Sequence, residues 1–562
     1  MSKTVSRRRI AMRAPAYAAL ATALSLTMLT AAAAQTQGAD ATSQPPPQAS
    51  PACSAAPPVS TAPGAAPVSA SPACGQETPP PPPPVIDNTP IGASSLSSLD
   101  LFSAGRETGL GTDLWKGSSA AIARQVIPSL DSAQLSPAGA LLARAVLATT
   151  ATAPDGAGTD AVLAAERVKA LLDLGDAEGA GMILDRTPGL SASSALSQAA
   201  AEVALINDQP DKACAVGEAL SVDRDGIYWL RLRAFCQARA GKPDLAQLTL
   251  TLANQQAPDP IFGRLMGAVI AGGGDPGPAS LRNGLDYALS TQLKLDLTPA
   301  LAHASPPIAR KLAALTPPPP PPPPPAADAA QGAAPGAAPA SALVSETDIL
   351  SMLRSAPDYA AYLAAAKAEQ PAIAGLVQAK APLTAPIALA TAAIAAGDLA
   401  DADAIRAGLV QDQISGAAPG DLAILDATLA AAHGKLDSPT LDKLVELGQQ
   451  GEGLARQRIQ IAAALDFALG TPMGPDARAA FASFGLPPSR LTVTRLLTLD
   501  TAADLGLKGE TALVSLQIAE DSGAGGPGFA DRVRIVRALQ RAGLAHYAQA
   551  FAVEGLVQLQ GR

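Results

Sequence analysis

The chain has 562 residues, a formal net charge of −9 and only 3% aromatic residues. An acidic protein repels phosphate backbones and anionic lipid, so we expect neither nucleic acid nor a membrane surface as a partner. Because large aromatic side chains are scarce, any core must be built from Ala, Leu, Val and Ile, and this composition favours closely packed helices.

The N-terminus has the pattern of an export signal. Residues 1–13 include five Lys or Arg residues, and Ala14–Ala34 is uncharged and mostly apolar. We therefore predict a signal peptide over 1–34, cleaved before Gln35, and a periplasmic or secreted protein with no membrane insertion after cleavage. The alternative is an uncleaved inner-membrane anchor, since about 20 apolar residues can span a bilayer. Ser6–Ile10 resembles a twin-arginine signal but lacks its bulky apolar pair, which leaves the Sec and twin-arginine routes open.

Two proline-rich segments divide the rest of the chain. Residues 35–92 consist mostly of Pro, Ala, Ser and Thr, with too few large apolar side chains to offset the entropy lost on ordering. The run Pro317–Pro325 begins a second such segment over 317–340. We predict a disordered linker over 35–92, a polyproline and Ala/Gly linker over 317–340, and helical domains over 93–316 and 341–562. The first linker fits both a tether and a solubilising spacer.

Helical periodicity is clearest between residues 196 and 236. One apolar stripe consists of Leu196, Ala199, Ala200, Val203 and Ile206. The segment Asn207–Pro210 interrupts this pattern, and Pro210 then fits the first turn of a second helix. After a turn at Asp223–Gly226, Asp225 is placed to cap a third helix. This order predicts an antiparallel helical hairpin.

The pattern of helix, glycine turn and helix recurs along the chain. It is found at Gly175-Asp176, Gly241-Lys242, Gly397-Asp398 and Gly543. The best copy has Ala234, Gly241, Ala246, Leu250, Ala253 and Pro258. This spacing resembles the tetratricopeptide and related helical repeats. The resemblance implies an all-α fold with two TPR-like α-solenoid domains of helical hairpins.

The four cysteines form two groups. Residue 225, inside the predicted turn, lies midway between Cys214 and Cys236, so an antiparallel hairpin brings both thiols to the same level. In an oxidising compartment this predicts a structural disulfide, and without a Cys-x-x-Cys spacing we expect no redox role. Cys53 and Cys74 fall within the first linker, and their pairing, within one molecule or between two, stays open.

Readable signatures of enzymes and metal sites are missing from the sequence. His303, His433 and His546 form no zinc-binding pattern, and no Gly-x-Ser-x-Gly, Ser-x-x-Lys or phosphate-loop motif occurs. Ser221–Gly226 resembles part of a calcium loop, but Leu232 stands where the bidentate carboxylate belongs, so we interpret the segment as a turn. We expect no catalytic residue, no cofactor and no metal.

A cationic stripe is predicted near the C-terminus. Arg534, Arg537 and Arg541 fall on one face of a helix that begins near Asp531. On an acidic protein such a stripe could contact an anionic partner. A solvated helix face is the alternative, and Arg also favours the negative end of a helix.

These features together favour binding over catalysis. Stacked helical repeats form extended concave surfaces that suit peptides and proteins. We expect a non-enzymatic periplasmic scaffold or assembly factor that mediates protein–protein interaction with unknown envelope proteins. The alternative is an enzyme or enzyme accessory that binds cell-wall peptidoglycan, and a third hypothesis is a structural spacer that binds nothing specific.

Overall fold

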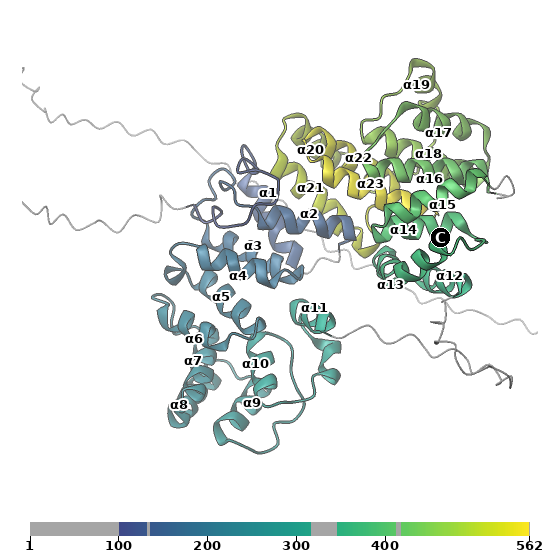
Figure 1. Ribbon diagram of the computed structural model, residues 1–562. Coiled ribbons are helices and arrows are strands. Elements are labelled where there is room, and N and C mark those ends of the chain that lie inside the picture. The colour runs from purple at the N-terminus through teal and green to yellow at the C-terminus, as the bar shows by residue number, and fades with distance from the viewer. Residues whose placement is uncertain (1–99, 132–134, 316–344, 412–416, 561–562) are drawn as a thin grey trace, which may run out of the picture. The chain divides into compact units, whose positions relative to one another are not determined.

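The computed structural model describes residues 100–131, 135–315, 345–411 and 417–560. Within these ranges the regular elements are helices, with no β-strand, which confirms the all-α fold class (Figure 1). None of the described helices has both the length and the apolar character needed to cross a membrane. The predicted signal peptide, both predicted linkers, Cys53 and Cys74 lie outside the described residues.

The helices before residue 316 are α1 (Ala120–Val126), α2 (Pro137–Ala148), α3 (Ala161–Asp173), α4 (Ala177–Arg186), α5 (Ser194–Ile206), α6 (Pro210–Ala219), α7 (Ile227–Arg239), α8 (Pro243–Gln256), α9 (Pro260–Ala271), α10 (Gly284–Gln292) and α11 (Pro306–Leu315). Short 3-10 helices occur at Ile127–Asp131, Leu190–Ala192, Thr298–His303 and, near the C-terminus, Gly523–Gly525.

The helices after residue 344 are α12 (Glu346–Ser355), α13 (Tyr359–Gln378), α14 (Pro386–Ala396), α15 (Leu399–Gln411), α16 (Pro419–His433), α17 (Ser438–Gln450), α18 (Gly453–Ala468), α19 (Pro475–Phe481), α20 (Val493–Asp504), α21 (Lys508–Glu520), α22 (Phe529–Arg541) and α23 (Ala545–Gln560).

Left-handed glycines form the turns of the predicted hairpins. Gly175, Gly241, Gly397 and Gly543 have φ angles of 88°, 70°, 90° and 78°. Glycine adopts this conformation without steric cost and so reverses the chain directly after a helix. In the first of these turns, the Asp176 N–H donates to the carbonyl of Leu171 at 3.1 Å and closes the end of α3. The four hairpin turns predicted from the sequence are therefore confirmed.

The predicted disulfide joins α6 to α7. The Cα atoms of Cys214 and Cys236 are 5.6 Å apart, within the range of bonded cysteines, and the pairing is confirmed. The expectation that Asp225 caps α7 is wrong, because the N-cap residue is Gly226 and no side chain caps this end. Asp223 adopts a φ of 48°, and its carbonyl accepts the Gly226 N–H at 3.1 Å, so the turn spans Asp223–Gly226 as predicted and α7 begins one residue later than a cap at Asp225 implies.

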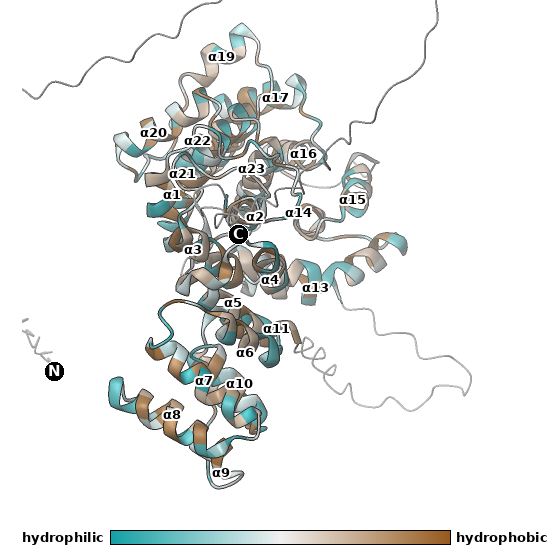
Figure 2. Ribbon diagram, turned by 90° about the vertical axis from the view of Figure 1, so that its left-hand side faces the viewer, coloured by the Kyte–Doolittle hydropathy of each residue, from teal (hydrophilic) through white to brown (hydrophobic). Residues whose placement is uncertain are grey.

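The α7–α8 hairpin packs through small residues. Ala234, Ala246 and Ala253 are completely buried, and Leu250 is 4% exposed. Alanine at these positions lets the two helices approach closely. In Figure 2, brown and teal residues occur together along both α7 and α8, as amphipathic packing requires. With the hairpins α3–α4, α5–α6 and α7–α8 packed in this way, the fold is helical-repeat-like.

Helices from both sides of residues 316–344 share one core. Trp115 and Leu142 are fully buried in the same cluster as Leu513 and Phe551. Helices α1 and α2 pack on α21, and α2 also packs on α23 (Figure 1). The sequence left open whether the two helical regions touch, and these contacts answer that they do. The domain boundaries at 316 and 341 remain a prediction.

A buried ion pair lies at this junction. Arg532 of α22 is completely buried, Glu554 of α23 is 2% exposed, and Arg532 Nη1 lies 2.7 Å from Glu554 Oε1. The other carboxylate oxygen, Oε2, accepts the backbone N–H of Ala138 at 2.9 Å. Ala138 belongs to the first turn of α2, where N–H groups have no partner within the helix. One carboxylate therefore joins α22, α23 and α2.

Removing the Cys214–Cys236 bond should lower the free energy of unfolding by about 3 kcal/mol, because the unfolded chain loses a constraint on a loop of this length. We expect this loss for C214A/C236A in urea denaturation followed by circular dichroism. Any further effect of a reductant on this variant would belong to Cys53 and Cys74. Equal stability of variant and wild type would contradict the prediction.

Removing the carboxylate alone should destabilise the fold strongly. The variant E554L leaves the Arg532 charge buried without its partner, and we expect a loss of about 3–5 kcal/mol in the free energy of unfolding. The double variant R532L/E554L removes both charges and should recover part of that loss. Denaturation curves of the three proteins test this, and a double variant no more stable than E554L would contradict it.

Candidate functional site

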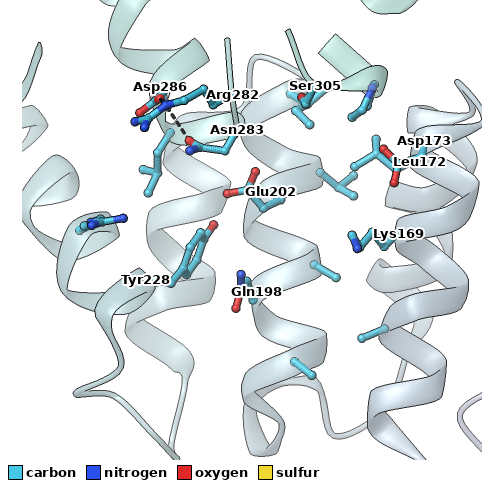
Figure 3. Close-up of a pocket in the computed structure, with 18 of the residues that line it drawn as sticks. Lys169, Leu172, Asp173, Gln198, Glu202, Tyr228, Arg282, Asn283, Asp286 and Ser305 are labelled. Carbon is cyan, nitrogen blue, oxygen red and sulfur yellow. Dashed lines mark hydrogen bonds and ion pairs between the residues drawn. The ribbon is translucent and has the colours of Figure 1, made fainter. Parts of the chain in front are cut away.

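A cavity of about 520 Å³ lies on the inner side of the first hairpins (Figure 3). Helices α3, α5 and α7, each the first helix of its hairpin, supply one wall. The opposite wall comes from the start of α9, the start of α10 and the residues that lead into α11. The chain thus folds back over its own repeat helices and encloses a space between them.

Glu202 of α5 points into this cavity (Figure 3). Its Oε2 accepts the backbone N–H of Gly284 at 2.7 Å. Its Oε1 is buried. Burial raises the pKa of Glu202 and outweighs the hydrogen bonds from Gly284 and Tyr228, which lower it. The hydrogen-bonding neighbours of this carboxylate are therefore neutral groups.

The hydroxyl of Tyr228, on α7, faces Glu202 (Figure 3). This hydroxyl is buried, and the Glu202 carboxylate is its hydrogen-bonding neighbour. Burial, with the adjacent Glu202 carboxylate, raises the pKa of Tyr228 well above its usual value. The ring packs edge-on against Trp229, with 5.1 Å between centroids, which fixes its direction. Tyr228 therefore enters the cavity as a neutral hydroxyl.

The other carboxylates at the α9–α10 side have cationic partners. Arg282 Nε lies 2.7 Å from Asp286 Oδ2, and Arg282 Nη2 lies 3.1 Å from Asp259. Arg231 Nη1 approaches Asp259 at 3.5 Å. By contrast, no lysine or arginine among the described residues forms an ion pair with Glu202. The cavity thus holds one buried carboxylate whose charge is not compensated.

Apolar side chains surround these polar groups. The lining includes Leu172, Val203, Ile206, Phe262 and Leu285, each 5% exposed or less. Gln198, one turn before Glu202 on α5, is exposed and stands at the cavity edge. Ser305 adds one more buried hydroxyl for which the described residues supply no partner. The cavity is suited to a group that has hydrogen-bond donors at one end and an apolar body.

The predicted cationic stripe lies on α22, and most of it is already paired. Arg534, Arg537 and Arg541 are exposed on one helix face. Arg534 Nη1 lies 3.0 Å from Asp500 Oδ2, and Arg541 forms an ion pair with Asp504. Both aspartates belong to α20. Within the described residues, Arg537 forms no hydrogen bond or ion pair. Contact of this stripe with an anionic partner remains a prediction, with Arg537 as its available charge.

The other residues singled out from the sequence do not converge on a site. His433 Nε2 lies 3.0 Å from Asp403, His303 lies in a 3-10 helix, and His546 stacks edge-on against Tyr547. No group of His, Cys, Asp and Glu in the described part of the chain could hold a metal ion. The segment Ser221–Gly226 forms the turn before α7.

Sequence reasoning missed Glu202 as a functional candidate. A signal was present, because Glu202 is the only charged residue of α5 and directly precedes Val203 of the predicted apolar stripe. A charged residue in an otherwise uncharged buried helix is uncommon and calls for a partner. The groups around it come from α7 and from the start of α10, which the local pattern could not connect to α5.

Comparisons of the chain with protein-family models, with curated proteins and with solved structures gave no match. The functional argument therefore depends on the fold and on the geometry of the cavity.

The raised pKa of Glu202 predicts a pH-dependent difference between wild type and E202Q. The folded state keeps the proton at pH values where the unfolded carboxyl, with a pKa of about 4.3, has lost it. The wild type should therefore lose stability relative to E202Q as pH rises from about 4 through the raised value. Urea denaturation of both proteins between pH 4 and 8 measures this. A difference that stays constant with pH would contradict it.

Proposed function

We propose that the protein is an exported, non-enzymatic TPR-like scaffold of the cell envelope that binds another envelope protein through its cavity-bearing hairpins. The observation that carries the proposal is the group of buried oxygens of Glu202, Tyr228 and Ser305 around one cavity, in which Glu202 has no cationic partner among the described residues. A buried carboxyl group without a counter-charge is costly, so such a group is typical of a site that another molecule completes.

The repeat architecture supports a polypeptide as that molecule. The first helices of consecutive hairpins line the cavity, which is the face that helical repeats use for peptide segments. The returning segment at α10 and α11 covers part of this face, so the remaining space fits a side chain or a short segment. Export by the predicted signal peptide would place this face in the envelope.

The test is site-specific photo-crosslinking in the cells that produce the protein. A photoreactive amino acid replaces Gln198 at the cavity edge of the full chain, and captured material is identified by mass spectrometry. We expect one envelope protein to be captured repeatedly. The matched control replaces Leu454 of α18, which is 79% exposed and outside the cavity, and should capture much less of it.

Two outcomes would overturn the proposal. Capture of wall fragments without a protein partner at residue 198 would favour peptidoglycan binding. Equal capture from positions 198 and 454, or none from either, would favour a structural spacer.

A further inference from the structure

We infer that the cavity recognises the ammonium group of a lysine side chain presented by the partner protein, with Glu202 as its counter-ion. This inference rests on the proposed function and adds the chemical class of the group that is bound. The charges around the cavity support it. Asp259 and Asp286 share Arg282, whereas Glu202 has no cationic partner among the described residues.

The hydrogen-bonding groups of the cavity match an ammonium ion. Glu202 Oε1, Tyr228 Oη and Ser305 Oγ are buried oxygens that line the same space. The Glu202 carboxylate and the Tyr228 hydroxyl interact with each other, and among the described residues Glu202 has no cationic partner. A carboxylate only accepts hydrogen bonds, and both hydroxyls can accept them. A lysine ammonium has three donors and no acceptor, so it can donate to the neighbouring oxygens of Glu202 and Tyr228 and supply the positive charge that Glu202 lacks.

The walls of the cavity fit the rest of a lysine side chain. Leu172, Val203 and Phe262 line the cavity and offer apolar contacts to the methylene stem. Lysine commonly lays its stem along apolar surface while its ammonium group reaches polar partners. A ligand with the same stem but no charge would leave Glu202 uncompensated, which is the basis of the expected selectivity.

An ammonium group on an apolar stem could also belong to a cell-wall peptide, so the test includes a protein lysine and a wall-peptide amine. The probes are the capped peptide acetyl-Gly-Ser-Lys-Ser-Gly-amide, its norleucine analogue, its acetyl-lysine analogue, and an amine-containing wall stem peptide. Affinity for each is measured by calorimetric titration of the full mature chain. Norleucine keeps the apolar stem without the ammonium group, and acetyl-lysine keeps the length without the charge.

For the wild type we expect the lysine peptide to bind at least about tenfold tighter than both uncharged analogues, as a hydrogen-bonded charge pair would give. E202Q should reduce this ratio to about one. The matched control E166Q, which changes a cavity-lining carboxylate paired with Lys169 at 3.7 Å, should keep it. If E202Q does not fold, Y228F, which removes one acceptor and keeps the ring, should lower the ratio.

Equal binding of the lysine and norleucine peptides, or a lysine preference that survives in E202Q, would overturn the inference. Tighter binding of the wall stem peptide than of the lysine peptide would overturn the assignment to a protein lysine. Crosslinking from position 198 separates this failure from that of the proposed function. If E202Q still captures a partner protein and the wild type shows no lysine preference, the proposed scaffold function stands and only the inference of lysine recognition is contradicted.

Discussion

The buried Arg532–Glu554 pair is a charged contact inside the core that the two helical regions share. Glu554 also holds the first turn of α2, and α2 packs against α3, which lines the cavity. The pair fixes its surroundings as well, since a Cβ on Gly555 would lie 2.6 Å from the Arg532 side chain. In a core built mainly of alanine and leucine, this contact adds direction to the meeting of α2, α22 and α23, because apolar packing alone is less directional. Hydrogen bonds from Ser119 to Glu510 and from Gly509 to Leu114 do the same where α21 meets the segment around α1.

The cavity depends in turn on a second close approach of backbone to side chain. The chain returns to α5 at Gly284, where a Cβ would lie 2.7 Å from Glu202 Oε2 and 3.0 Å from Leu205. Glycine therefore lets the start of α10 come near enough for its N–H to donate to Glu202. The same approach closes the cavity and engages Oε2, so that Oε1 is the carboxylate oxygen on the side of Tyr228. The orientation of Glu202 thus results from the backbone path.

Local features of this chain were readable from sequence, and long-range pairings were not. The glycine turns and the Cys214–Cys236 bond depend on residues close together in the chain, so periodicity and spacing were sufficient. Arg532 belongs to the same helix as the predicted cationic stripe, yet its side chain is completely buried, because its partner lies 22 residues later on α23. Glu202 was missed for the same reason, since Gly284 is 82 residues away. A helical stripe describes one element and does not identify its partners.

Folded proteins are only marginally stable, so an uncompensated polar group in the interior needs a reason. The elements around the cavity are held firmly: the disulfide ties α7 to α6, and Arg282 joins Asp259 at the start of α9 to Asp286 of α10. These contacts hold the helices that carry Tyr228 and Glu202 in place. A rigid frame around polar groups is how a binding site is preorganised, because its bound partner does not have to order it. The proposed recognition of a partner at Glu202 requires such a frame.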